Sequence, residues 1–303
     1  MAATSSIKSS QQALNLQARG EQEAARLPAL LLAAEKIAGT LMLGLHGRHR
    51  AGPGETFWQY RPYDVSDDRK MIDWRQSARS PSRLYIRQTE WESADIVYIW
   101  TACGNGFDFH YNDALPEKQQ RAELIAAALA ILLNRAGERI GLLDEKHGGP
   151  PLSGRDAPQR FVTRLIQREE NAGKSPPPLP QTRQKVQAVY LGDFYQPLDR
   201  LADWIRKGSA QGIRGTLMQI CDPSEEDFPF EGRLAFYQSP DEAPLVFGNA
   251  AASRERYQQR FAAHRQTLAE ICRRHGWRFL HHRTSSPSLE ALLALHNILA
   301  GER

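Results

Sequence analysis

The run Asp95-Ile96-Val97-Tyr98-Ile99-Trp100 decides the fold, because it is almost entirely apolar over the length of one strand. Continuous apolar runs of this kind are typical of parallel strands, which helices cover on both faces. Residues 118–136 follow with apolar side chains at helical spacing, and residues 139–143 form a second short apolar run. A strand, a helix and a strand in this order predict a βαβ unit with a right-handed crossover.

The alternation of strands and helices continues towards the C-terminus. Further strands are expected at residues 187–191, 214–220 and 277–281, and further helices at residues 156–168, 197–207, 251–275 and 288–299. Ala235-Phe236-Tyr237 is expected to be a short edge strand. The predicted fold class is therefore α/β, with a doubly wound, mostly parallel sheet. In such a sheet, functional sites lie beyond the carboxyl ends of the strands.

Three segments differ in composition. Residues 1–43 have a helical pattern, with Pro28 near the first turn of a second helix. Residues 44–92 are rich in Gly, Arg and Asp and lack helical periodicity. Residues 93–303 carry the strand–helix alternation, which a proline-rich linker interrupts at residues 171–183. We therefore expect an N-terminal helical segment, an irregular segment and an α/β domain.

The overall composition is that of a globular protein, because 41% of the 303 residues are hydrophobic and 24% are charged. This balance excludes wholesale disorder, collagen-like repeats and a disulfide-stapled miniprotein. Cys103, Cys221 and Cys272 lie far apart, which favours thiols in a reducing compartment over a zinc knuckle. Charged residues interrupt the most apolar stretch, at residues 27–45, so no membrane span is expected. The sequence predicts a cytoplasmic, soluble protein.

The charge balance argues against a large nucleic-acid footprint. The chain has 39 Lys and Arg against 35 Asp and Glu, a net charge of +4, and its basic residues are interleaved with acidic ones. Such interleaving favours salt-bridged or solvated faces. The densest basic stretch contains eight arginines: Arg254, Arg256, Arg260, Arg265, Arg273, Arg274, Arg278 and Arg283.

The irregular segment holds arginines and aspartates close together in sequence. The planar guanidinium group binds a carboxylate through two parallel hydrogen bonds, so these residues predict a structural clasp that can double as a docking surface. We call this set the Arg/Asp clasp: Arg61, Asp67, Asp68, Arg69, Asp73, Trp74, Arg75 and Arg79. An alternative interpretation has Asp67, Asp68 and Asp73 hold a divalent metal for phosphodiester chemistry, but the neighbouring arginines would neutralise such a site.

Several motifs of this segment occur in a recognisable order. They are Gly-x-Gly-x-x-Phe at residues 52–57, Arg-x-Tyr at residues 61–63, Asp-Asp-x-x-x-Ile-Asp-Trp-Arg at residues 67–75, and Ala78-Arg79. Together they resemble the signature of domain-of-unknown-function family 58 (DUF 58). The stretch Asp222-Pro223-Ser224-Glu225, followed by Pro229-Phe230-Glu231-Gly232, is also similar to that family. One departure is Ser66, where the family usually has Gly.

The resemblance implies both a fold and a function. The second half of this family resembles von Willebrand factor A-type domains, which are doubly wound α/β folds. Members are commonly encoded near MoxR-type AAA+ ATPases. The resemblance therefore implies a non-catalytic interaction module, without a cofactor, that works with a MoxR-type ATPase or its client protein in maturation or assembly.

The metal motif of A-type domains is degenerate in this chain. Such domains often bind Mg²⁺ through Asp-x-Ser-x-Ser at the tip of the first strand, whereas Ala102, Gly104 and Gly106 occupy the three ligand positions here. A shift by one residue supplies no carboxylate either. Asp193 matches a further acid of the pattern, but one carboxylate holds Mg²⁺ weakly. The sequence predicts no metal, and a plain turn at Gly104 and Gly106.

Other chemistry finds little support in the sequence. Cys103 with His110 lacks a third group that would mark a nucleophilic triad. His281 and His282 are adjacent in a predicted strand, so their side chains point to opposite faces and do not share an ion. No phosphate-binding glycine motif is present. We expect no enzyme; the alternative hypothesis is a nucleic-acid-associated protein or metal-dependent phosphodiesterase that uses the Asp67/Asp68/Asp73 cluster and the C-terminal arginines.

Overall fold

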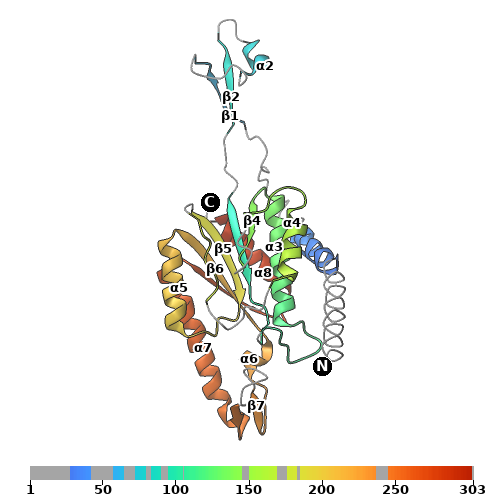
Figure 1. Ribbon diagram of the computed structural model, residues 1–303, viewed down its shortest axis with the longest axis vertical. Coiled ribbons are helices and arrows are strands. Elements are labelled where there is room, and N and C mark those ends of the chain that lie inside the picture. Colours follow the sequence, from blue (N-terminus) through green and yellow to red (C-terminus); the bar gives the residue numbers. More distant parts are fainter. Residues whose placement is uncertain are drawn as a thin grey trace, which may run out of the picture. The chain divides into compact units, whose positions relative to one another are not determined.

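The computed structural model consists of two compact units, which we describe separately (Figure 1). One unit comprises Met1–Leu45 and Asp95–Arg303, and the other comprises His46–Ala94. The structure describes residues 28–41, 57–64, 72–79, 83–89, 95–104, 106–144, 150–168, 176–182, 185–236 and 245–301.

A five-stranded sheet forms the centre of the larger unit, in the order β4-β3-β5-β6-β9. The strands are β3 (Ile96–Thr101), β4 (Arg139–Leu142), β5 (Val186–Gly192), β6 (Ile213–Cys221) and β9 (Arg278–Arg283). Every neighbouring pair is parallel. From β3 the chain first moves outward to β4 and then returns to the other side of β3 to build the rest of the sheet. This arrangement confirms the predicted α/β class.

Helices cover both faces of this sheet (Figure 1). They are α3 (Lys118–Arg135), α4 (Ala157–Ile166), α5 (Leu198–Ala210), α7 (Ala250–Arg274) and α8 (Ser288–Gly301). Helix α3 packs against α4 and α8, whereas α5 packs against α7. Residues 28–41 form a further helix, and its small side chains Ala34 and Ala38 are buried in the same hydrophobic core. Among the described residues, no helix is long and apolar enough to span a membrane.

An aromatic cluster fills the core between the sheet and α5. The Trp277 ring stacks on Tyr190 at 5.7 Å and meets Trp204 edge-on at 5.1 Å. Gly215 on β6 makes this packing possible, because a Cβ atom there would lie 2.2 Å from the Trp277 ring. The indole nitrogen of Trp277 donates a hydrogen bond to the Ile213 carbonyl at 3.0 Å, so the polar end of the buried ring is satisfied.

A short strand is present where Ala235–Tyr237 predicts one, but it does not belong to the five-stranded sheet. Strand β7 (Leu234–Phe236) pairs antiparallel with β8 (Leu245–Phe247) in a separate two-stranded sheet. The edge position next to β6 in the main sheet is occupied by β9, and β7 pairs with the next strand in sequence, β8. Strand β8 was not predicted, because it is only three residues long.

The smaller unit contains a two-stranded antiparallel sheet and a short helix. The strands are β1 (Phe57–Pro62) and β2 (Tyr85–Thr89), and the helix is α2 (Trp74–Ser77). Asp73 caps this helix, because its side-chain oxygen accepts a hydrogen bond from the backbone N–H of Gln76 at 3.0 Å. The antiparallel pairing places Arg61 opposite Ile86.

Candidate functional site at the carboxyl ends of the strands

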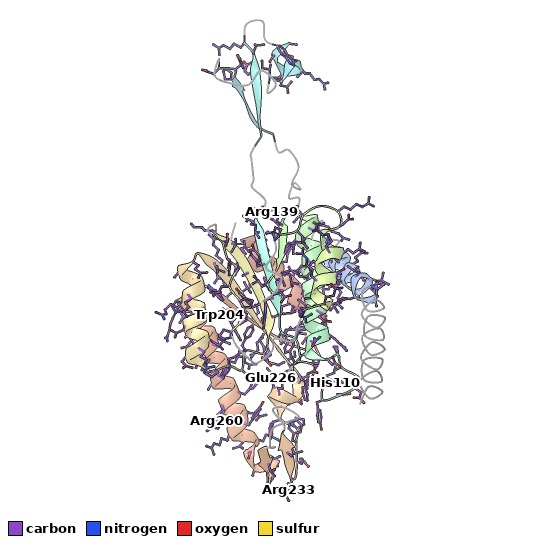
Figure 2. All side chains as sticks on the ribbon, viewed as in Figure 1. His110, Arg139, Trp204, Glu226, Arg233 and Arg260 are labelled. Carbon is purple, nitrogen blue, oxygen red and sulfur yellow. The ribbon has the colours of Figure 1, made fainter. Side chains whose placement is uncertain are left out.

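The candidate site lies where the chain reverses direction in the sheet, between β3 and β5. Ligands of doubly wound proteins bind at this point, beyond the carboxyl ends of the strands. Asp193 follows β5, and the short helix α6 (Pro223–Asp227) follows β6 at the same end. The backbone N–H of Tyr111, in the loop before α3, lies 3.4 Å from Asp222 Oδ2. Figure 2 shows the labelled residues His110 and Glu226 near this end of the sheet.

A buried lysine occupies the centre of the site. Lys118 is the first residue of α3, and only 2% of its side chain is exposed. Its Nζ atom lies 2.7 Å from Glu225 Oε1 and 3.6 Å from Asp193 Oδ2. Three aromatic rings surround the same ammonium group, with centroids 5.4–5.8 Å away: Phe107, Phe109 and Tyr195.

The two carboxylates keep this lysine charged. Burial by itself lowers the pKa of Lys118, but Glu225 and Asp193 outweigh burial and raise the pKa above its usual value. Burial raises the pKa of Glu225, and Lys118 offsets part of that increase. The site therefore holds an ammonium group between the side chains of Glu225 and Asp193.

A capping box holds Glu225 in position. Asp222 Oδ1 accepts a hydrogen bond from the backbone N–H of Ser224, and Glu225 Oε2 accepts one from the backbone N–H of Asp222, both at 2.8 Å. The stretch Asp222-Pro223-Ser224-Glu225 has the side chains that this reciprocal capping needs, with proline in the first turn. Both oxygens of Glu225 are thus engaged, one by the cap and the other by Lys118.

Internal side chains hold the loop after β3. The Ala102 carbonyl accepts a hydrogen bond from Arg168 Nη2 at 3.1 Å, and the Gly104 N–H donates to Gln119 Oε1 at 3.0 Å. The Gly106 N–H donates to Asp108 Oδ1 at 3.1 Å. Gly104 and Gly106 have φ angles of 68° and 81°, which favour glycine. The loop is therefore a turn in which the N–H groups of Gly104 and Gly106 already bind side chains of the protein itself.

The residues of this site do not fit a divalent metal. Ala102, Gly104 and Gly106, at the positions where A-type domains carry ligands, have no side-chain oxygen to offer. Asp193 does lie at the site, as predicted from its sequence position, but its carboxylate faces Lys118. A dication would be repelled by the buried ammonium group that already neutralises the available carboxylates.

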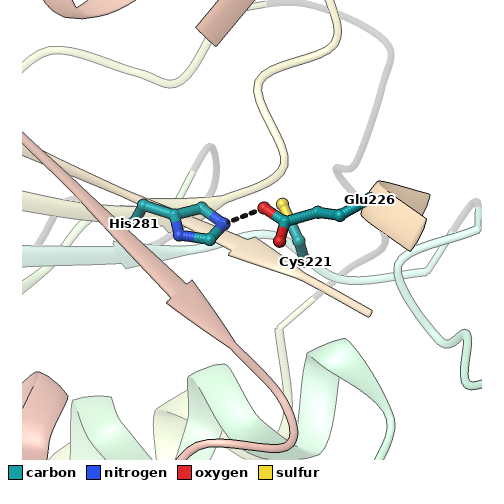
Figure 3. A group of neighbouring side chains, drawn as sticks. All are labelled: Cys221, Glu226 and His281. Carbon is teal, nitrogen blue, oxygen red and sulfur yellow. Dashed lines mark ion pairs between the residues drawn. The ribbon is translucent and has the colours of Figure 1, made fainter. Parts of the chain in front are cut away.

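A second group of possible ligands lies nearby and joins three elements (Figure 3). Cys221 Sγ, one carboxylate oxygen of Glu226 and one ring nitrogen of His281 lie within 4.8 Å of one another. Thiolate, carboxylate and imidazole are a zinc-binding set in principle. However, Glu226 Oε1 already contacts His281 Nε2 at 2.6 Å and Arg265 Nη1 at 2.5 Å. Burial also raises the pKa of the Cys221 thiol. Glu226 is therefore better explained as the centre of a polar link that joins α6 to Arg265 on α7 and to His281 on β9.

Sequence reasoning missed Lys118, Glu225 and this second group. Lys118 and Glu225 are 107 residues apart, so no local pattern pairs them. One signal was available, because helices favour acidic side chains in their first turn and α3 has a lysine there instead.

The structure places only part of the Arg/Asp clasp. Asp67, Asp68 and Arg69 lie outside the described residues, and nothing is described of the Arg61 side chain. Trp74 is 65% exposed, and Arg75 and Arg79 are exposed as well. Asp73 caps α2. The clasp belongs to the smaller unit, so it is built separately from the site around Lys118.

Several C-terminal arginines bind groups of their own chain. Arg254 donates to the carbonyls of Phe228 and Phe230, at 2.9 and 3.3 Å. Arg265 pairs with Glu226 at 2.5 Å. Arg283 pairs with Asp227 at 2.5 Å, and Arg274 with Glu270 at 3.5 Å. Arg256, Arg260 and Arg273 are exposed. The arginine-rich stretch thus serves in part to tie α6 and β9 to α7.

Aromatic rings form a row across the same end of the molecule, which we call the aromatic row. It runs from the loop before α3, through the residues just after α6 and then α7, to the loop after β5, with centroids of successive rings 4.5–6.0 Å apart. Its members are Tyr111, Phe230, Phe228, Tyr257, Phe261 and Tyr195. Tyr111, at one end, is 55% exposed; Tyr195, at the other, is 41% exposed, although its hydroxyl group faces the buried Cys221 thiol at 3.8 Å.

His282, next to the site on β9, makes stability depend on pH. Burial, with the nearby charges of Arg121 and His281, lowers the pKa of His282 from 6.5 to about 4. Between these values the unfolded chain binds a proton that the folded chain does not, so acidification favours unfolding. We expect this residue to remove about 2–3 kcal/mol of unfolding free energy between pH 7 and 4.5.

The comparison of wild type with His282→Gln isolates this contribution. Urea unfolding at several pH values should give a steeper loss of stability below pH 6.5 for the wild type than for the variant. Parallel pH curves for the two proteins would show that His282 titrates normally in the folded state.

Comparison with known proteins gives relatives with no assigned function. Uncharacterized proteins of Mycobacterium bovis and of Mycobacterium tuberculosis strain H37Rv are each 24% identical over 289 residues, which cover 88% of this chain and 87% of each relative.

Two solved structures are also similar. One is an aerotolerance-related membrane protein from Bacteroides fragilis, with a TM-score of 0.43 and 15% identity over 67% of this chain and 98% of that one. The other is the conserved hypothetical protein BatB from Bacteroides thetaiotaomicron, with a TM-score of 0.41 and 11% identity over 69% of this chain and 100% of that one. A family model described as protein of unknown function DUF58 matches residues 59–267, in agreement with the motifs of the irregular segment. The chain belongs to the DUF58 family.

Proposed function

We propose that this chain is a non-catalytic protein-interaction module that binds its partner without a metal ion. The observation that carries the proposal is the ammonium group of Lys118, which neutralises Asp193 and Glu225 at the switch point of the sheet. A metal-dependent domain needs an open cation at this place, and here the cation is internal and enclosed. A partner is therefore recognised by the surface around the site.

The exposed ends of the aromatic row are the best candidates for that surface. Tyr111 and Tyr195 are exposed, yet each packs against further rings, so their conformations are already restricted. Rigid tyrosines contribute strongly to protein interfaces, because they bury a large area and lose little entropy on binding. Arg254 donates a hydrogen bond to the Phe230 carbonyl, and Glu231 follows Phe230 in sequence. Arg254 and Glu231 lie 4.0 Å apart and add polar groups at the edge of this surface.

The partner class comes from the family resemblance. Members of this family are commonly encoded near MoxR-type AAA+ ATPases, so the proposed partner is such an ATPase or its client protein. We place this interaction in the cytoplasm. In support, Cys103, Cys221 and Cys272 are buried thiols, as a reducing compartment allows.

Binding to the purified MoxR-type ATPase encoded nearest to this gene tests the proposal. We expect Tyr111→Ala to weaken binding about tenfold or more, and Tyr111→Phe to retain most of it, because the ring makes the contact. Trp74→Ala, at an exposed ring of the Arg/Asp clasp, serves as the matched comparison and should leave the affinity unchanged.

The possible results separate the hypotheses. Loss of binding in Trp74→Ala alone would assign the docking surface to the clasp. Absence of binding to the ATPase and its clients, together with nucleic-acid binding that weakens steeply with salt, would contradict the proposal and favour the nucleic-acid hypothesis. The binding assay contains no chelator, because the ATPase itself requires Mg²⁺ with its nucleotide.

A further inference from the structure

The N-terminus of α3 carries a residue that local helix physics disfavours. The first turn of a helix has a partial positive charge, so acidic side chains stabilise it and a lysine does not. Helix α3 nevertheless begins with Lys118 and has no acidic residue in its first turn. Burial of a lone ammonium group at this position would add a further cost. The position of Lys118 therefore needs compensation from outside the helix.

Two carboxylates from other parts of the chain, one after β5 and one in α6, compensate the charge of Lys118. Asp193 follows β5 and Glu225 follows β6, and each places one carboxylate oxygen within 4 Å of Lys118 Nζ. Two carboxylates this close together, mostly out of solvent, repel one another unless a cation lies between them. Oxygen ligands of this kind also bind hard dications such as Mg²⁺, Mn²⁺ and Ca²⁺. The carboxylates are thus arranged as for a cation, and the cation is part of the chain.

We propose that Lys118 is the resident cation of this site and substitutes for a divalent metal ion, so that its removal creates a metal-binding site from Asp193 and Glu225. The inference deepens the metal-free interaction proposed above, but it concerns the isolated chain and holds whichever partner binds. Because the Lys118 side chain is only 2% exposed and aromatic rings enclose its ammonium group, a partner's carboxylate does not reach it.

Metal titration of Lys118→Ala tests this inference. After treatment with EDTA and its removal, we expect about 5 mM Mn²⁺ or Mg²⁺ to raise the melting temperature of Lys118→Ala by about 5 °C and to leave the wild type unchanged. The electron paramagnetic resonance signal of free Mn²⁺ should fall in the presence of this variant and stay constant with the wild type.

Two matched variants separate charge from space. Lys118→Met removes the charge but fills the volume, so metal should not raise its melting temperature. Lys118→Ala/Glu225→Gln opens the same volume but keeps a single carboxylate, so its response to metal should be largely lost. Arg206→Met, at an exposed ion pair on α5, keeps the carboxylate site intact and should behave like the wild type. Because the metal titration uses the isolated chain, its outcome is independent of the partner experiment.

The following results would overturn the inference. The wild type could be stabilised by Mn²⁺, or a folded Lys118→Ala could fail to respond. If Lys118→Ala does not fold at all, addition of Mn²⁺ during refolding decides the matter. Refolding of Lys118→Ala only in the presence of the ion supports the inference. Failure of Lys118→Ala to refold with the ion contradicts it, and this conclusion does not depend on whether Lys118→Ala/Glu225→Gln folds.

Discussion

Replacing Lys118 with Met is expected to lower the free energy of unfolding by about 3–5 kcal/mol. Methionine has nearly the same length and volume, so the packing against Phe107 and Phe109 is retained while the charge is lost. Glu225 and Asp193 then face each other without a cation. Removing one partner of a buried ion pair destabilises a protein far more than replacing the whole pair with apolar residues.

Urea unfolding at pH 8 measures this loss, and two controls identify its cause. Glu225→Gln in the Lys118→Met background removes one of the uncompensated carboxylates, so the double variant should be more stable than Lys118→Met alone. Acidification should also narrow the gap between wild type and Lys118→Met, because burial already raises the pKa of Glu225 and loss of Lys118 raises it further. A loss below about 1 kcal/mol at pH 8 would mean that water solvates these carboxylates in the folded protein.

The second large effect is expected for Arg168→Met, also about 3–5 kcal/mol. Arg168 connects the end of α4 to Glu123 on α3 and to the loop after β3: its Nη1 lies 3.2 Å from Glu123 Oε1, and its Nη2 lies 3.1 Å from the Ala102 carbonyl. The side chains of Arg168 and Glu123 are 2% and 3% exposed. Loss of the guanidinium group leaves a buried carboxylate and a buried carbonyl with fewer hydrogen bonds.

Arg206 provides the matched control for this experiment. It pairs with Asp203 at 2.9 Å, but both side chains are about two-thirds exposed. Arg206→Met should therefore cost less than about 1 kcal/mol, because water replaces the lost partner. Equal effects of Arg168→Met and Arg206→Met would show that the buried pair contributes no more than a surface pair.

Much of the fold follows from local sequence patterns. The apolar runs at β3, β5 and β6 are fully or largely buried, as expected for the interior of a parallel sheet. Residues 28–41 are helical, as their apolar spacing predicts. The short strand expected at Ala235–Tyr237 is present as β7, but its pairing with β8 in a separate sheet was not predicted, because strand pairing is decided by the tertiary fold.

The sequence predicts where the strand ends lie, but it does not predict the ion pairs around Lys118. The loop after β3 and Asp193 lie at the predicted end of the sheet, and the residues at the ligand positions lack donors, as their sequence indicated. Lys118 was considered only as the start of a helix, because its charge partners are distant in sequence. The Arg/Asp clasp remains a prediction, because four of its seven charged members lie outside the described side chains.

The position of Lys118 at the first turn of α3 also decides how the site responds to its surroundings. A dissociable ion obeys mass action, so the occupancy of its site follows the free ion concentration. A tethered ammonium group has no such equilibrium, because its local concentration is fixed by the chain and its entropy of association is lost once, during folding. Dilution, chelators and competing ions therefore leave the occupancy unchanged. Only unfolding of the N-terminal turn of α3 empties the site.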